Sequence, residues 1–333
     1  MLKSMPKELY QRPTIACSAV QAGLPSGRRL GECNGQVAVM MQRAVVRRAR
    51  LIHPPRVNAN AFWRSVKARP VHEGVNLLIF RPLGYVLARA LLPTRVKPPH
   101  IVLAHTALGM VAARCIAANA DLPAALLLQV KTLLDNVDGQ LARLRGEESA
   151  LGRYLDTEAD FVANAALFWA LGRRTRAPWQ ALLAFGWFTL VLSWDFNVEY
   201  CYRHVRGERF RPALPEPEHG VARLLGCLYQ YFFAPQDQLI RWIEQQSFAW
   251  ITRHVSPEER ARLALHWWDR SVLIAVVNFG LTTQYCWLGW FVARHRPRAF
   301  LSFVLAQGPY LGLVYLWRIL RIRYAIQSQR SRR

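Results

Sequence analysis

The sequence predicts an all-α, polytopic integral membrane protein with about six transmembrane helices and an N-terminal interfacial helix. Two observations support this fold class. The mean hydropathy is +0.04 although 20% of the residues are charged, so apolar segments and concentrated charge must alternate along the chain. Several apolar segments also reach about 20 residues, the length of helix that crosses the hydrocarbon core of a bilayer.

The formal net charge of +23 is typical of proteins that bind nucleic acid, membrane surfaces or acidic substrates. Most Lys and Arg residues lie outside the apolar segments, and the sequence contains no nucleic-acid-binding motif. We therefore expect a membrane partner and no nucleic acid. The six cysteines form no C-x-x-C pair, which indicates scattered reduced thiols rather than disulfides or a zinc site.

The N-terminal part of the chain differs from the rest. Residues 1–73 are basic and lack clear periodicity, so we expect an extension without stable structure. Residues 74–97 are apolar but are interrupted by Arg81 and Arg89. This pattern predicts an amphipathic helix that lies on the bilayer surface and does not cross it.

Residues 98–325 are expected to form a six-helix membrane domain, followed by a basic tail at 326–333. The predicted transmembrane helices correspond to the main apolar segments of this domain. These segments are 101–120, 122–134 (which continues as a polar helix), 152–171, 177–196, 271–293 and 299–320.

The longest connection, residues 197–270, is predicted to be a cytoplasmic insertion with amphipathic helices resting on the membrane. Ser256, Pro257 and Glu259 match the start of one such helix, as N-cap, first helical residue and capping-box partner. The Lys and Arg distribution places both termini and the insertion in the cytoplasm, although a few arginine-containing turns would then face outward. We expect a bacterial inner-membrane protein whose active site faces the cytoplasm.

Four carboxylates lie close to two of the predicted transmembrane helices, where a charged group is costly and needs a reason. Asp135 and Asp138 are three residues apart, and Asp156 and Asp160 are four apart, so each pair shares one helical face. An antiparallel hairpin would bring the two faces together. Because four clustered carboxylates repel one another, they suit two hard divalent cations, Mg²⁺ or Mn²⁺, which together can clamp a pyrophosphate.

The neighbours of these aspartates complete a longer pattern: Asp135-x-x-Asp138-Gly139-x-x-Ala142-Arg143, then Gly152-x-x-x-Asp156-x-x-x-Asp160. The pattern resembles the signature of the CDP-alcohol phosphotransferase (CDP-alcohol phosphatidyltransferase class I) family. The resemblance implies that Asp135, Asp138 and Asp156 are metal ligands, and that Asp160 is both a ligand and the catalytic base. It also implies that Gly139, Arg143 and Ser149 contact the CDP group.

The resemblance further implies a phospholipid-synthesising transferase, in which an alcohol attacks a CDP-activated substrate and CMP leaves. We expect CDP-diacylglycerol as donor and a small polar alcohol, with or without a phosphate, as acceptor. An alternative is transfer of a CDP-linked headgroup to diacylglycerol. A transporter or an inactive lipid-binding membrane protein is the alternative of another class, but a transporter does not need the glycines and the arginine at fixed offsets.

The acceptor site is less clear from the sequence. Arg203 and Arg206 are candidates for contact with the acceptor, although a basic cluster after a transmembrane helix is typical of topology signals. Asn278 is a third candidate, with hydrogen bonding between helices as its alternative role. One departure from the family concerns the first transmembrane helix, where a polar pair is replaced by Pro99 and Val102.

Two further expectations concern the apolar helices. His100 or Thr106 is expected to substitute for the missing polar pair in nucleotide binding. The spacing Gly308-x-x-x-Gly312 is typical of helix packing, with a homodimer contact as the alternative.

Overall fold

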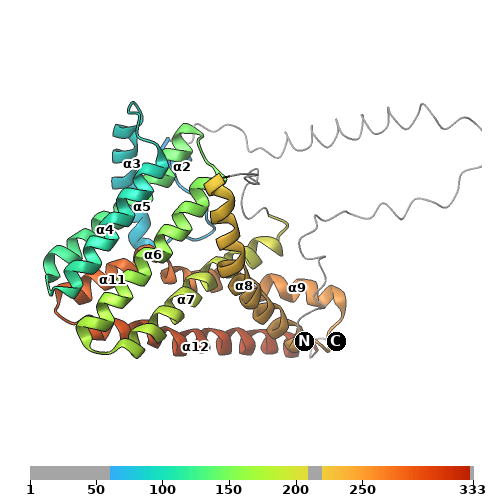
Figure 1. The fold of residues 1–333 in the computed structure, drawn as a ribbon. Coiled ribbons are helices and arrows are strands. Elements are labelled where there is room, and N and C mark those ends of the chain that lie inside the picture. Colours follow the sequence, from blue (N-terminus) through green and yellow to red (C-terminus); the bar gives the residue numbers. More distant parts are fainter. Residues whose placement is uncertain (1–60, 209–219, 331–333) are drawn as a thin grey trace, which may run out of the picture. The chain divides into compact units, whose positions relative to one another are not determined.

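The computed structural model describes residues 61–208 and 220–330, and all regular structure within these ranges is helical (Figure 1). The predicted all-α class is therefore confirmed for the described residues. They belong to one compact unit, Ala59–Arg333. Most of the predicted extension, residues 1–60, and the last three residues of the predicted basic tail lie outside the described part of the chain.

The centre of this unit is formed by α4 (Pro98–Ala117), α5 (Asp121–Arg145) and α6 (Ala150–Thr175). Helix α4 packs against both α5 and α6, and Figure 1 shows the three together. The turn between α5 and α6 is short. Gly146 ends α5 in the left-handed conformation, with φ of 67°. Ser149 then starts α6 by accepting a hydrogen bond from the backbone N–H of Gly152.

Three helices are long and apolar enough to cross a membrane: α4, α7 (Pro178–His204) and α12 (Pro297–Arg330). A bent helix pair ending in α11 (Leu281–Ala293) is a fourth candidate. Helices α5 and α6 are similarly long, but their charged residues lower their hydropathy. The predicted class of integral membrane protein agrees with these apolar helices.

The predicted transmembrane helix over residues 271–293 is broken in the structure. It consists of α10 (Arg270–Val276), a 3₁₀ turn at Val277–Phe279 and α11, and the helical axis bends by 41°. The break lies at Gly280, where a Cβ atom would clash with Oε1 of Glu73. The carboxylate of Glu73 accepts hydrogen bonds from the N–H and the hydroxyl of Thr283, so it caps the start of α11.

The predicted insertion contains α8 (Gly220–Ile251) and α9 (Pro257–Trp267). The N-cap of α9 is confirmed, because the Ser256 hydroxyl accepts the N–H of Glu259. Helix α8 packs against α6 and α7 (Figure 1). A fully buried ion pair, with Nη2 of Arg318 2.7 Å from Oε2 of Glu244, also joins α8 to α12. The insertion is thus part of the helix bundle, which its amphipathic pattern alone did not predict.

Residues 61–73 differ from the expectation of an unstructured extension over 1–73. They form the short helix α2 (Ala61–Ser65) and a loop that is tied to α7 by Arg69. The periodicity of the sequence could not predict this structure, because ion pairs between Arg69 and a distant helix hold the segment in place. The predicted interfacial helix corresponds to a π-helical turn, η2 (Asn76–Phe80), and to α3 (Arg81–Leu91). Its position on the bilayer surface stays a prediction.

Helix α12 carries the Gly308-x-x-x-Gly312 spacing. A Cβ atom at Gly308 would lie 3.2 Å from the indole of Trp187 on α7, so this glycine allows close packing within the chain. Nothing lies within 4 Å of a Cβ atom at Gly312 in the described part of the chain. The homodimer contact stays a prediction.

Candidate metal centre and adjoining pocket

The α5–α6 hairpin brings the four aspartates together around His105 of α4. One ligand atom each from His105, Asp138 and Asp156 lies within 4.8 Å of the others. The same holds for His105, Asp135 and Asp160. The i, i+3 and i, i+4 spacings place each pair on one helical face, and the short turn directs both faces to the same site.

His105 is a site residue that the sequence reasoning missed. Its side chain is fully buried, and its Nε2 atom lies 3.3 Å from Oδ2 of Asp138 and 3.9 Å from carboxylate oxygens of Asp135 and Asp156. Neither ring nitrogen has a hydrogen-bond partner among the described residues. The available signal was a polar residue inside the apolar segment 101–120, where such residues usually have a function.

His100 and Thr106, the residues expected to substitute for the missing polar pair in nucleotide binding, both make local hydrogen bonds. The Nδ1 atom of His100 accepts the N–H of Lys97 at the start of α4. The hydroxyl of Thr106 donates to the carbonyl of Val102. A role for either residue in nucleotide binding stays a prediction.

Lys131 is a second missed residue, one turn before Asp135 on α5. Its Nζ atom lies 2.7 Å from Oδ1 of Asp160, and its side chain has no exposed surface. The ammonium also lies 4.7 Å from the centre of the Tyr285 ring. A lysine inside an apolar segment is an unusual feature that could have drawn attention to it.

The cluster suits a divalent cation. Oδ2 of Asp138 and Oδ1 of Asp156 are buried and have no hydrogen-bond partner among the described residues. Buried carboxylate oxygens are almost always satisfied, so these two need a partner. Clustered carboxylate oxygens are the ligands that Mg²⁺ and Mn²⁺ prefer.

The residues expected to contact the CDP group lie at the hairpin end of α5 and α6. Gly139 makes room for Arg143, whose Nη2 atom would lie 3.1 Å from a Cβ atom at that position. The Nε–H of Arg143 donates to the carbonyl of Ser65. Ser149 is the N-cap of α6, and its contact with a nucleotide stays a prediction.

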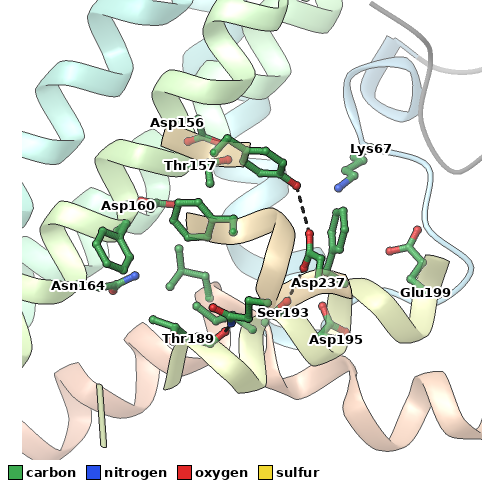
Figure 2. Close-up of a pocket in the computed structure, with 18 of the residues that line it drawn as sticks. Lys67, Asp156, Thr157, Asp160, Asn164, Thr189, Ser193, Asp195, Glu199 and Asp237 are labelled. Atoms are coloured by element: carbon green, nitrogen blue, oxygen red, sulfur yellow. Dashed lines mark hydrogen bonds between the residues drawn. The ribbon is translucent and has the colours of Figure 1, made fainter. Parts of the chain in front are cut away.

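A pocket of about 320 Å³ adjoins the metal centre on the side of Asp156 and Asp160. Helices α6, α7 and α8, the loop at 67–73 and the start of α11 form its walls. In Figure 2, Asp156 and Asp160 project from α6, and the carboxylates of Asp195 and Asp237 lie on the facing side. The pocket is therefore built from segments that are far apart in the sequence.

Arg69 connects the loop of this pocket to α7. Its Nε and Nη2 atoms lie 2.8 Å from carboxylate oxygens of Glu199 and Asp195. Burial opposes its charge, but these two carboxylates outweigh burial and raise the pKa of Arg69. Burial raises the pKa of Glu73, and the nearby charge of Asp195 adds to this effect.

A second arginine shapes the same loop. Nη1 of Arg81 lies 2.7 Å from Nδ1 of His72, which must be unprotonated to accept this hydrogen bond. Burial, and then the charge of Arg81, lower the pKa of His72 to about 4. This histidine is therefore neutral near pH 7.

The three acceptor-site candidates from the sequence are not among the described residues that line this pocket. Arg203 bonds to Glu199 and to the carbonyl of Ala68. Arg206 donates to backbone carbonyls, including that of Trp268. Asn278 is exposed on the 3₁₀ turn before α11. Contact of these residues with an acceptor stays a prediction.

Apolar helices and a buried carboxylate cluster define an integral membrane protein with a candidate metal centre. Comparison with known proteins shows which family part of the chain matches. Residues 95–216 match the CDP-alcohol phosphatidyltransferase family, a family of metal-dependent transferases in phospholipid synthesis, which confirms the resemblance for this part of the chain. The matched range contains all four aspartates and the helices α4 to α7.

A relative of known location supports the membrane assignment. The chain is 36% identical over 110 residues to the inner membrane protein YnjF of Escherichia coli (strain K12). The match covers 32% of this chain and 50% of that protein, so it spans half the length of the relative. Helices α8 to α12 lie beyond the matched family range.

Proposed function

We propose that this protein is a phospholipid-synthesising transferase that joins an alcohol to a CDP-activated substrate and releases CMP. The donor is CDP-diacylglycerol, and the acceptor is a small polar alcohol. The observation that carries the proposal is the convergence of the four aspartates around His105, directly beside a pocket whose lining includes charged side chains. A metal centre and a second substrate cavity are the two parts that such a transfer needs.

The residues divide the reaction between them. Asp135, Asp138, Asp156 and Asp160 would hold two divalent cations, Mg²⁺ or Mn²⁺. When bound, such ions neutralise the phosphates and stabilise the leaving group. Arg143, beside Gly139, would bind a phosphate of the donor with its planar guanidinium.

Asp160 is the candidate base because the family resemblance implies this role and because its carboxylate borders both the pocket and the metal centre. A hydroxyl entering from the pocket would reach Asp160, transfer its proton to the carboxylate and attack the β-phosphate of the donor. The bond between the β-phosphate and CMP then breaks. The alcohol and the phosphatidyl group are then joined, and CMP leaves with the negative charge that develops on its phosphate oxygen.

The membrane arrangement belongs to the same proposal. Helices α4 to α7, the α10–α11 pair and α12 make six transmembrane segments, with the hairpin turn and the insertion in the cytoplasm. The shortest of the single helices, α4, has 20 residues, which is enough to cross a bilayer. The similarity to an inner membrane protein supports the same membrane for this chain.

The second candidate is transfer of a CDP-linked headgroup to diacylglycerol. The metal centre serves both reactions, so the pocket decides between them. Lys67, Asp195 and Asp237 place charged groups in its wall, and these suit the hydroxyl groups of a small polar alcohol better than the acyl chains of a lipid. This observation favours CDP-diacylglycerol as the donor.

The direct test uses the full chain in nanodiscs, with CMP release as the readout. CDP-diacylglycerol is supplied with Mg²⁺ and a panel of alcohols, and CDP-choline with diacylglycerol forms the second arm. We expect CMP release that depends on Mg²⁺, on CDP-diacylglycerol and on an alcohol, and that EDTA abolishes it. A folded preparation without metal-dependent turnover in either arm would favour an inactive lipid-binding protein and refute the proposal.

A further inference from the structure

The pocket beside Asp160 carries information about the acceptor, given the proposed transfer. Besides Asp156 and Asp160, its described lining residues include four carboxylates and two cationic side chains. The carboxylates are Glu73, Asp195, Glu199 and Asp237, and the cations are Lys67 and Arg69. The acceptor class depends on which of these charges have partners within the protein.

The four carboxylates already have partners. Asp195 and Glu199 share Arg69, and Glu199 also pairs with Arg203 at 3.0 Å. Glu73 accepts two hydrogen bonds from Thr283. An ammonium group on the acceptor would therefore find carboxylates that are already neutralised or hydrogen-bonded.

The carboxylate of Asp237 accepts hydrogen bonds from three side chains among the described residues. It accepts hydrogen bonds from the Ser193 hydroxyl, from the amide of Asn197 at 2.7 Å and from the hydroxyl of Tyr229 at 3.2 Å. Figure 2 shows Asp237 and Ser193 together at the wall opposite α6. This network fixes hydroxyl and carboxylate groups at the pocket surface before any ligand binds.

A phosphate on the acceptor is disfavoured by the same charges. The guanidinium of Arg69 donates from Nε and Nη2 to carboxylates, so these two donors are committed. A phosphate dianion offers only hydrogen-bond acceptors, and the donor groups of Ser193, Asn197 and Tyr229 already serve Asp237. Arg203 and Arg206, the two arginines expected to contact the acceptor, are not among the described residues that line the pocket.

We propose that the acceptor is an unphosphorylated polyhydroxy alcohol. The hydroxyl groups of such an acceptor can donate hydrogen bonds to Asp237 and Asp195 and can accept them from neighbouring donors. Their binding adds no charge to the pocket. Phe161 and Phe233 give the same pocket apolar faces for the C–H groups of a polyol. A volume of about 320 Å³ suits a small molecule of this kind.

The test compares matched pairs of acceptors with CDP-diacylglycerol. Glycerol is paired with glycerol 3-phosphate and inositol with inositol 1-phosphate, and serine and ethanolamine form the amine arm. We expect kcat/KM for a neutral polyol to be at least ~10-fold higher than for its phosphate or for either amine. A phosphorylated or amine acceptor that reacts fastest would overturn the acceptor class and leave the proposed transferase function intact.

Variants of the pocket separate this proposal from the transferase proposal itself. Asp237→Asn and Ser193→Ala should each raise KM for the polyol ~10-fold while KM for CDP-diacylglycerol stays unchanged. Glu258→Gln, at an exposed carboxylate on α9, is the control. If no alcohol reacts, binding is measured instead: a thermal shift with polyol but not with its phosphate supports the acceptor class, and the reverse contradicts it.

An independent observation concerns Lys131. Its ammonium is enclosed, with Oδ1 of Asp160 at 2.7 Å and the Tyr285 ring at 4.7 Å. The stem of Lys131 passes Gly109 of α4, where a Cβ atom would stand 3.4 Å from its Cε atom. The lysine is thus held in place by residues of α4, α6 and α11, and its charge is directed at one oxygen of the candidate base.

We infer that Lys131 is a positioning residue that occupies one oxygen of Asp160 and limits its coordination of a cation. Asp160 then keeps an oxygen toward the pocket, where the acceptor hydroxyl arrives. Without the lysine, both oxygens of Asp160 become available to a cation. Removal of Lys131 should therefore strengthen metal binding and weaken turnover, a combination that structural damage does not produce.

The test measures Mn²⁺ binding by electron paramagnetic resonance, in nanodiscs and without nucleotide. We expect Lys131→Met to bind Mn²⁺ at least ~10-fold more tightly, because a positive charge close to the site is lost. Lys131→Arg should retain the affinity of the unmodified protein, and Lys97→Met, at an exposed lysine, is the control. Unchanged or weaker Mn²⁺ binding by folded Lys131→Met would refute the inference.

Discussion

The α5–α6 hairpin and the pocket beside it both gather carboxylates, but they compensate the charge in different ways. In the hairpin, one oxygen each of Asp138 and Asp156 is buried and lacks a hydrogen-bond partner among the described residues. In the pocket, Asp195 and Glu199 pair with Arg69. This difference underlies the two proposals, a hairpin that takes up cations from outside the protein and a pocket that binds a neutral ligand.

The largest expected effect is on the hairpin. Asp156→Asn removes a candidate metal ligand and should lower turnover at least ~10³-fold, because the phosphates lose a stabilising charge. The measurement is CMP release at saturating Mg²⁺, with expression and thermal unfolding as checks of folding. Glu158→Gln, two residues further along α6, should keep turnover within about twofold. Substantial activity in Asp156→Asn would remove this residue from the metal centre.

A substitution in the pocket should change the stability of the protein rather than its metal binding. Arg69→Met leaves Asp195 and Glu199 without their shared cation, which costs ~3–5 kcal/mol when a buried ion pair is broken. The free energy of unfolding in mixed micelles measures this loss. Addition of Asp195→Asn and Glu199→Gln to the same variant should recover part of it, since no uncompensated charge remains. No recovery would mean that the ion pairs are not the cause.

The break before α11 tests how the loop at 67–73 is attached. Gly280→Ala places a Cβ atom against the Glu73 carboxylate and should destabilise the protein by ~1–3 kcal/mol, as overpacking does. Gly186→Ala is a matched control, because nothing described lies within 4 Å of its Cβ position on α7. Thermal unfolding of both variants gives the comparison. Equal stability of the two would contradict the close contact.

Ser149 distinguishes a structural role from a role in nucleotide binding. Ser149→Ala removes the N-cap of α6 and should cost ~1 kcal/mol. Ser149→Asp keeps a capping oxygen, so it should retain stability. If Ser149 also contacts the CDP group, the donor KM should rise in both variants. A normal KM in Ser149→Asp would limit this residue to capping.

The smallest effect concerns His72. Its pKa falls from 6.5 to about 4 on folding, so the unfolded chain binds a proton first as the pH falls. The contribution to stability is therefore complete above pH 6.5 and is lost progressively as the pH falls from 6.5 to 4. Because the side chain is partly exposed, solvent screening reduces the loss to ~1 kcal/mol.

Urea unfolding across this pH range measures the effect. His72→Gln should flatten the pH dependence, while His254→Gln, at an exposed position on the turn after α8, should not. An unchanged profile in His72→Gln would assign the pH dependence to other groups.

Local spacing accounts for what could be predicted about the site. Asp135, Asp138, Asp156 and Asp160 are encoded by i, i+3 and i, i+4 offsets in two consecutive helices. Their convergence follows from a short turn, so a sequence pattern is sufficient. His105 escaped prediction because it reaches the cluster from another helix through packing. Lys131 lies one turn before Asp135 on the same helix, but the family signature assigns no offset to it.

The fold also has features that the sequence predicts and features that it does not. Apolar length predicted α4, α7 and α12 well, because a membrane helix is defined by its own composition. The break at Gly280 depends on Glu73, which lies far earlier in the chain. Composition could not reveal it, since residues 271–293 are apolar on both sides of the break.

The sequence by itself determined the helical membrane class, the carboxylate hairpin and the family signature. Those features depend on hydropathy and on spacing within single helices, which act locally. Only the tertiary structure decided that α8 and the loop at 67–73 wall the pocket, and that Arg69 neutralises its carboxylates. Charge compensation depends on distances between residues from separate segments, and these distances exist only after the helices have packed.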